Sequence, residues 1–182
     1  VLVDGSSNTY SALASALESA DKTKVTAYTK PDDVCFWLYT SGTTGSPKGV
    51  VHLHSHLVPT AELYAVPILD ISEDDIVFSA AKLFFAYGLG NALTFPMAVG
   101  ASAILLEGPP EAERINKIFL EEKPTLFFGV PTLFAMLLAS DNLPTKDEHD
   151  VRLCISAGEP LPSDLLARWQ GTFGVDILDG LG

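Results

Sequence analysis

Residues 39–49 read YTSGTTGSPKG, a stretch rich in glycine and hydroxyl side chains that directly follows an apolar run. Gly42, Gly45 and Gly49 allow backbone conformations that other residues rarely adopt, so several N–H groups can point at one centre. Five hydroxyl side chains and Lys48 fall within nine residues of an acidic chain. We interpret 39–49 as a loop that binds nucleotide phosphates; the alternative is a solvent-exposed hairpin turn.

The loop does not match the phosphate loop of Walker-type ATPases. That loop requires glycine directly before the lysine and a helix after it. Here Pro47 precedes Lys48, and the following residues GVVHL read as a strand. The segment GLGNA at 88–92 is likewise too short for a dinucleotide-binding fingerprint.

The sequence around the loop predicts an α/β fold with a mainly parallel sheet and flanking helices, because strand-like and helix-like segments alternate. The run 34–39 is continuously apolar, which predicts a strand buried on both faces. Ser163 is placed to cap the last helix. Further strands are expected at 49–53, 76–80, 101–106, 125–128, 151–156 and 175–178, and helices at 10–18, 57–66, 88–98, 111–123, 131–139 and 163–173.

Ligands of such folds bind beyond the carboxyl ends of the strands. Those ends are FFGVPT (127–132), SAGEP (156–160) and LDGLG (178–182), each combining small residues with polar or aromatic ones. We therefore predict a site for a flat ligand there. The alternative is that glycine and proline merely terminate the strands.

Composition excludes several classes of function. The chain of 182 residues has a net charge of −12, which disfavours binding to nucleic acid or to an anionic membrane. No apolar stretch reaches the roughly 18 residues that a membrane span needs. Two distant cysteines, Cys35 and Cys154, suit a reducing compartment, so we expect a cytoplasmic protein.

Two further motifs receive structural interpretations. The histidines of HLHSH (52–56) alternate as on one face of a strand, yet no Cys, Asp or Glu in the segment completes a metal site. We assign them a structural role and expect no metal. The acidic run at 73–75 is expected to be a solvated turn.

Several motifs together carry a family resemblance. YTSGTTGSPKG resembles the phosphate loop of the adenylate-forming superfamily, which includes acyl- and aryl-CoA synthetases, luciferases and peptide-synthetase adenylation domains. KLFFAYGLGN, FFGVPT, SAGEPLP and ILDGLG follow in that family's order and spacing, and together they are most similar to the benzoate–CoA ligases. We expect residues 1–182 to be an internal part of the N-terminal AMP-binding domain, with the phosphate loop at 39–49, acid-pocket and adenine segments within 82–182, and the C-terminal lid domain absent.

The resemblance implies a two-step reaction. Such enzymes join a carboxylate to the α-phosphate of ATP, expelling pyrophosphate, and then exchange AMP for the thiol of coenzyme A. It implies ATP, Mg²⁺ and coenzyme A as co-substrates, with the Mg²⁺ ligand beyond residue 182, and benzoate as the small aromatic acid. We expect residues 1–182 alone to be inactive, and we leave open whether the protein forms a homodimer. The alternatives are 4-hydroxybenzoate or another acyl-CoA ligase, and a non-catalytic module that binds a nucleotide or acyl-adenylate.

The resemblance also implies residue roles. In the acid pocket Ala86 leaves a slot, Phe128 offers a ring, and the Tyr87 hydroxyl donates to the substrate carboxylate; for phenylalanines the alternative is core packing. Leu181 stands where many members have an aromatic residue. Catalytic roles fall on Thr43, Thr44 and Lys48. Nucleotide binding falls on Thr40, Ser41, Gly42, Thr43, Thr44, Gly45, Lys48, Gly158, Glu159, Pro160, Asp179, Gly180 and Leu181. Acid binding falls on Phe85, Ala86, Tyr87, Phe128, Ala157, Gly158, Gly180 and Gly182.

Overall fold

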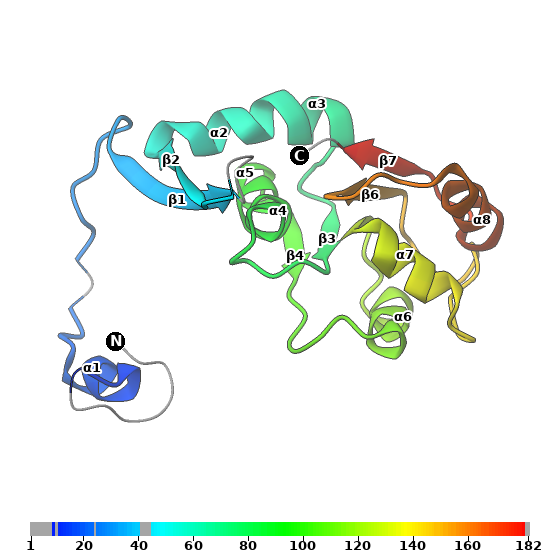
Figure 1. The fold of residues 1–182 in the computed structure, drawn as a ribbon, viewed down its shortest axis with the longest axis horizontal. Helices are drawn as coiled ribbons and strands as arrows, with labels where there is room; N and C mark the ends of the chain where they lie inside the picture. The colour runs from blue at the N-terminus through cyan, green and yellow to red at the C-terminus, as the bar shows by residue number, and fades with distance from the viewer. Residues whose placement is uncertain (1–8, 10, 24, 41–44, 181–182) are drawn as a thin grey trace. The chain divides into compact units, whose positions relative to one another are not determined.

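The computed structural model describes residues 9, 11–23, 25–40 and 45–180, in two compact units divided after Lys30. The first unit contains helix α1 (Leu13–Ser19), none of whose residues is buried. The second unit has the α/β architecture that the sequence predicted, with helices flanking a parallel sheet (Figure 1).

The sheet of the second unit has five parallel strands in the order β4-β3-β5-β6-β7. Helical connections return the chain to the start of each next strand, as parallel pairing requires. All five carboxyl ends therefore lie along one edge, and the segments beginning at 127, 156 and 178 belong to three neighbouring strands. The strands are β3 (Ile76–Ser79), β4 (Ser102–Ile104), β5 (Leu126–Gly129), β6 (Leu153–Ala157) and β7 (Ile177–Gly180).

Two of the helical connections contain a π-helical turn directly before a proline. Pro67 and Pro96 are each the second residue of the α-helical segment that follows such a turn. Proline lacks an N–H and its ring clashes with the carbonyl four residues earlier, which the wider turn relieves. The first connection comprises η1 (His54–His56), α2 (Leu57–Thr60), η2 (Ala61–Ala65) and α3 (Val66–Leu69); the second comprises α4 (Ala86–Leu89), η3 (Gly90–Thr94) and α5 (Phe95–Val99).

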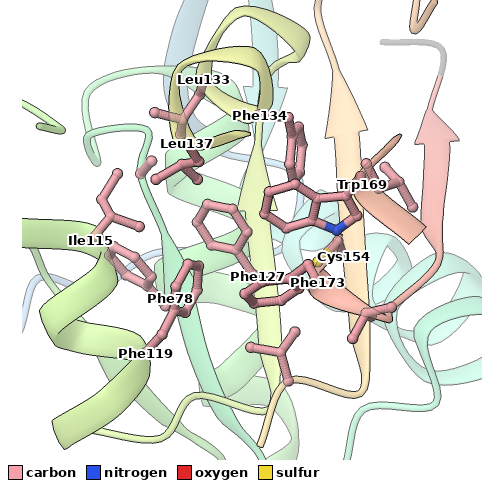
Figure 2. Packing of buried hydrophobic residues seen from close by; sticks show 14 of the residues in the cluster. Phe78, Ile115, Phe119, Phe127, Leu133, Phe134, Leu137, Cys154, Trp169 and Phe173 are labelled. Atoms are coloured by element: carbon pink, nitrogen blue, oxygen red, sulfur yellow. The ribbon is translucent and has the colours of Figure 1, made fainter. Parts of the chain in front are cut away.

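The remaining helices pack on the opposite face of the sheet, where an aromatic core forms (Figure 2). They are α6 (Ala112–Glu121), α7 (Pro131–Leu138) and α8 (Ser163–Phe173). The alternation of side chains along β5 divides the two cores, because Phe127 belongs to this aromatic cluster while Leu126 and Phe128 join the cluster under α2–α3 and α5. Phe134 and Trp169 pack edge to face, with ring centroids 4.8 Å apart.

The apolar run 34–39 does not form the doubly buried strand that was predicted. It forms β1 (Val34–Thr40), which pairs only with β2 (Lys48–Leu53) in a two-stranded antiparallel sheet within the described residues. Trp37 and Tyr39 are 56% and 74% exposed. An apolar run predicts a strand, but its burial depends on which elements cover it.

One further local prediction fails, and another holds only in part. Ser163 is the first helical residue of α8, behind Pro162 at the N-cap, and its side chain makes no capping hydrogen bond. In the acidic run, Glu73 and Asp74 are exposed in a turn as expected, but Asp75 is only 5% exposed. Arg152 donates to both carboxylate oxygens of Asp75, at 3.0 and 2.9 Å. Thr125 Oγ1 donates to the same carboxylate at 2.6 Å. None of the helices in the described ranges is long and apolar enough to cross a bilayer.

Candidate active site

Residues 39–49, which were expected to bind phosphate, include the end of β1 and the start of β2, the two strands of an antiparallel hairpin. Thr40 is paired directly opposite Lys48, so a hydroxyl and an ammonium group lie side by side on one face at the end of the hairpin. Gly45 has a φ of +83°, a conformation that favours glycine, and open space surrounds it. The hairpin topology matches the alternative interpretation, yet it also presents the groups that phosphate binding needs. Ser41, Gly42, Thr43 and Thr44 lie outside the described residues.

A cavity of about 690 Å³ lies at the carboxyl edge of the sheet. Ala80, Gly129 and Ala157, at or directly after the ends of β3, β5 and β6, form its floor. The start of α4 contributes Ala86, and α7 contributes Met136. Its volume lies within the range of about 300–1,000 Å³ that is usual for small-molecule sites. The strand ends therefore create a largely apolar pocket where the topology predicted a ligand.

Five of the residues expected to bind the acid line this cavity, namely Phe85, Ala86, Tyr87, Ala157 and Gly158. Two others, Phe128 and Gly180, do not. Phe128 is fully buried in the sheet core and contacts Tyr87 edge to face, so the core-packing alternative describes it. Gly180 does not line the cavity, although it is paired with Ala157, which does. Gly182 lies outside the described residues.

The Tyr87 hydroxyl is directed at the protein backbone rather than into the cavity. Its oxygen lies 3.2 Å from the carbonyl oxygen of Gly129 and 3.1 Å from that of Ile155. Burial raises the pKa of Tyr87, so the hydroxyl stays protonated and donates. Donation to a substrate carboxylate, as expected from the sequence, would require these bonds to break. In the structure Tyr87 instead ties α4 to the ends of β5 and β6.

Several lining residues escaped sequence reasoning. Among the described residues of the lining, Lys82 carries the one charge. Pro110 comes from the segment between β4 and α6, which no motif connects with the site. The α7 residues could have been found, because a helix that starts directly after the carboxyl end of a strand must border that edge. The lining residues that the sequence analysis did not assign individually are Ala80, Ala81, Lys82, Pro110, Gly129, Val130, Thr132, Leu133 and Met136, although Gly129, Val130 and Thr132 lie in the expected segment 127–132.

Of the two segments expected to enclose adenine, Gly158, Glu159 and Pro160 follow β6, whereas Asp179 and Gly180 belong to the adjacent strand β7 rather than to a loop after it. β6 pairs in parallel with β7, with Ser156 opposite Asp179 and Ala157 opposite Gly180. Gly158 has a φ of +87°, which turns the chain sharply after β6. Glu159 accepts a long hydrogen bond of 3.5 Å from the hydroxyl of Thr132. Leu181 lies outside the described residues, so its contact with adenine stays a prediction.

The histidine motif makes structural contacts. β2 ends at Leu53, so His54 and His56 belong to a 3₁₀ turn rather than to the expected strand. His52 stacks on Phe36 with ring centroids 5.0 Å apart, and His56 Nδ1 accepts the N–H of Leu53 at 3.2 Å. In the part of the chain that the structure describes, no group of three or more His, Cys, Asp or Glu residues could hold a metal ion.

The family model of AMP-binding enzymes matches residues 1–182. The chain belongs to this family. It is 56% identical over 170 residues to a benzoate–CoA ligase of Thauera aromatica and 47% identical over 171 residues to a 4-hydroxybenzoate–CoA/benzoate–CoA ligase of Rhodopseudomonas palustris. In both cases the match covers 93% of this chain and 32% of the relative.

Among solved structures, a benzoate CoA ligase from Burkholderia xenovorans is similar with a TM-score of 0.82 and 50% identity, over 97% of this chain and 35% of that chain. The chain thus spans about a third of the length of these relatives. Membership of the AMP-binding enzymes confirms the family expected from the loop at 39–49 and from the segments that follow it.

Proposed function

We propose that the full-length protein containing this chain is an AMP-forming acid–thiol ligase that converts benzoate to its coenzyme A thioester. The observation that carries the proposal is the apolar cavity at the carboxyl edge of the sheet, in a chain 56% identical to a benzoate–CoA ligase. An unpaired, buried thiol at Cys154 supports a cytoplasmic location, where thiols stay reduced.

The first step forms a bond between a carboxylate oxygen and the α-phosphorus of ATP while the bond to the β-phosphate breaks and pyrophosphate leaves. The reaction brings two anions together, so the protein must position them and neutralise charge. Thr40 and Lys48, adjacent across the hairpin, would hold the departing phosphates together with residues 41–45. In the second step the thiolate of coenzyme A attacks the acyl carbon, and AMP leaves.

The cavity would hold the aromatic ring. Ala80, Ala86 and Gly129 leave room for a flat group, and Phe85, which is 56% exposed, borders the opening. The Tyr87 hydroxyl would act by fixing α4 against the strand ends. Magnesium ion would reach the site with the nucleotide phosphates, and we assign it no ligand among the described residues.

A second candidate substrate is 4-hydroxybenzoate, because a relative 47% identical is named for both acids. A ring hydroxyl needs a hydrogen-bond partner once it is buried. Thr132 could accept from it, since its own hydroxyl donates only a long bond of 3.5 Å to Glu159, but it is the one side-chain hydroxyl of the described lining besides that of Tyr87. The predominantly apolar lining therefore favours benzoate.

The test is ATP–pyrophosphate exchange by the full-length protein with benzoate, 4-hydroxybenzoate or hexanoate, followed by detection of the thioester by mass spectrometry. We expect exchange that depends on an aromatic acid and is fastest with benzoate. A preference for hexanoate would refute the aromatic pocket. Tight binding of an aroyl-AMP analogue without exchange would show a binding module instead of an enzyme.

A further inference from the structure

Lys82 lines both the acid cavity and a second, smaller cavity. The smaller cavity has a volume of about 260 Å³ and shares Ala81 and Lys82 with the lining of the larger one. Its other walls are mostly apolar and include Leu83, Phe84 and Leu105. The exposed rings of Phe84 and Phe85 contact each other across this boundary, with centroids 4.5 Å apart. The partition between the two spaces is therefore the segment around Lys82.

The ammonium group of Lys82 ties this partition to a neighbouring loop. Lys82 Nζ donates to the carbonyl oxygens of Leu106 and Gly108, which follow the adjacent strand β4. Pro110, two residues further on, lines the acid cavity. Neither of the two ion pairs between described residues includes Lys82. The positively charged Nζ of Lys82 therefore donates to two backbone carbonyl oxygens, and hydrogen bonds from a charged donor are stronger than those from a neutral one.

The two ends of the tie are themselves fixed. The Phe85 N–H donates to the carbonyl oxygen of Lys82 at 3.0 Å. Gly88 packs so closely that a Cβ there would lie 2.1 Å from the same oxygen. On the other side, Gly108 has a φ of +71°, and a Cβ there would lie 2.7 Å from Arg114 Nη1. The backbone at Lys82 is therefore held closely by the start of α4, and the turn at Gly108 has a conformation that favours glycine.

We propose that Lys82 is a specificity-determining positioning residue of the acid pocket. Its aliphatic stem closes the passage to the 260 Å³ cavity, and its tie holds Pro110 in the wall. Acids whose ring carries a larger substituent are excluded because the neighbouring space is shut. This inference rests on the proposed activation of an aromatic acid.

The test compares four variants of the full-length protein. Lys82→Ala removes the stem and the tie, Lys82→Met removes the tie alone, and Lys82→Arg retains donors. Lys117→Met is the matched control, because this lysine is 68% exposed on α6, outside both cavities. The measured quantities are kcat/KM for benzoate and for its 2-, 3- and 4-ethyl derivatives, and hydrogen exchange of residues 105–110.

In Lys82→Ala we expect the preference for benzoate over at least one ethyl isomer to fall roughly tenfold or more, the discrimination that pocket space for one or two methylenes gives. Lys82→Met should change this preference less, and it should accelerate hydrogen exchange of residues 105–110. Lys82→Arg and Lys117→Met should resemble the wild type in both measurements.

An unchanged preference in Lys82→Ala would overturn the proposal. So would a KM that rises equally for every acid, because that result would mean that Lys82 binds the carboxylate. A wild-type protein that activates no aromatic acid would refute the proposed function and the selectivity role with it, while hydrogen exchange would still show whether the tie exists.

Discussion

Replacing Tyr87 by phenylalanine separates two roles for its hydroxyl. The structure directs the hydroxyl at the carbonyl oxygens of Gly129 and Ile155, so its removal leaves a buried acceptor without its donor. Such a loss costs about 1–3 kcal/mol of unfolding free energy. The KM for benzoate should change less than about threefold, because the ring that borders the cavity remains.

Tyr64→Phe is the matched control. Tyr64 packs against the same apolar cluster as Tyr87, and its hydroxyl has no hydrogen-bond partner among the described residues. We expect its urea midpoint to stay close to that of the wild type while the midpoint of Tyr87→Phe falls. A hydrogen bond to a charged group is worth about 1.5–3 kcal/mol, or roughly 10- to 150-fold in affinity. Unchanged stability with a KM raised by that factor would therefore refute the reasoning and restore donation to the carboxylate.

Three further perturbations test the framework by urea unfolding. Burial opposes ionisation of Asp75, but hydrogen bonds, of which that from Arg152 is the largest, hold the pKa of Asp75 at about 2. The folded protein should therefore lose stability as the pH falls below about 4. Arg152→Met should abolish most of this pH dependence. Burial lowers the pKa of His149 below its usual 6.5, so stability should be full above pH 6.5 and decline below it, and His149→Phe should remove that decline. Gly88→Ala would place its Cβ 2.1 Å from a carbonyl oxygen and should destabilise by several kcal/mol, whereas Gly171→Ala has open space and should stabilise by about 0.4–1 kcal/mol; equal midpoints for these two would contradict the packing at the first position.

The order of strands and helices could be predicted from the sequence because hydrophobic periodicity, and the glycine and proline residues that end elements, are local features. Gly100 and Gly174 end their helices with φ values of 82° and 78°, as glycine signals predict. The alternation of strand-like and helix-like segments predicted the parallel sheet. The parallel sheet in turn predicted that a ligand cavity would lie at the carboxyl ends of its strands. The π-helical turns before Pro67 and Pro96 were not foreseen, since the helical period continues through them.

The contents of the site were less predictable, because they depend on contacts between distant segments. The pattern of β5 does not say on which face of the sheet Phe128 lies, and the structure places it in the core. Lys82 and Pro110 meet the cavity only because β3 and β4 are neighbours. The same limit explains the exposed side chains of β1, because its apolar sequence indicates a strand but does not say whether other elements cover it.

The most direct test of the account is a crystal structure of the full-length protein with benzoate and a non-hydrolysable ATP analogue. We predict that the aromatic ring occupies the 690 Å³ cavity between Ala86 and Gly129, and that the β- and γ-phosphates lie near Thr40 and Lys48. A ring bound outside that cavity, or β- and γ-phosphates far from the hairpin, would contradict it.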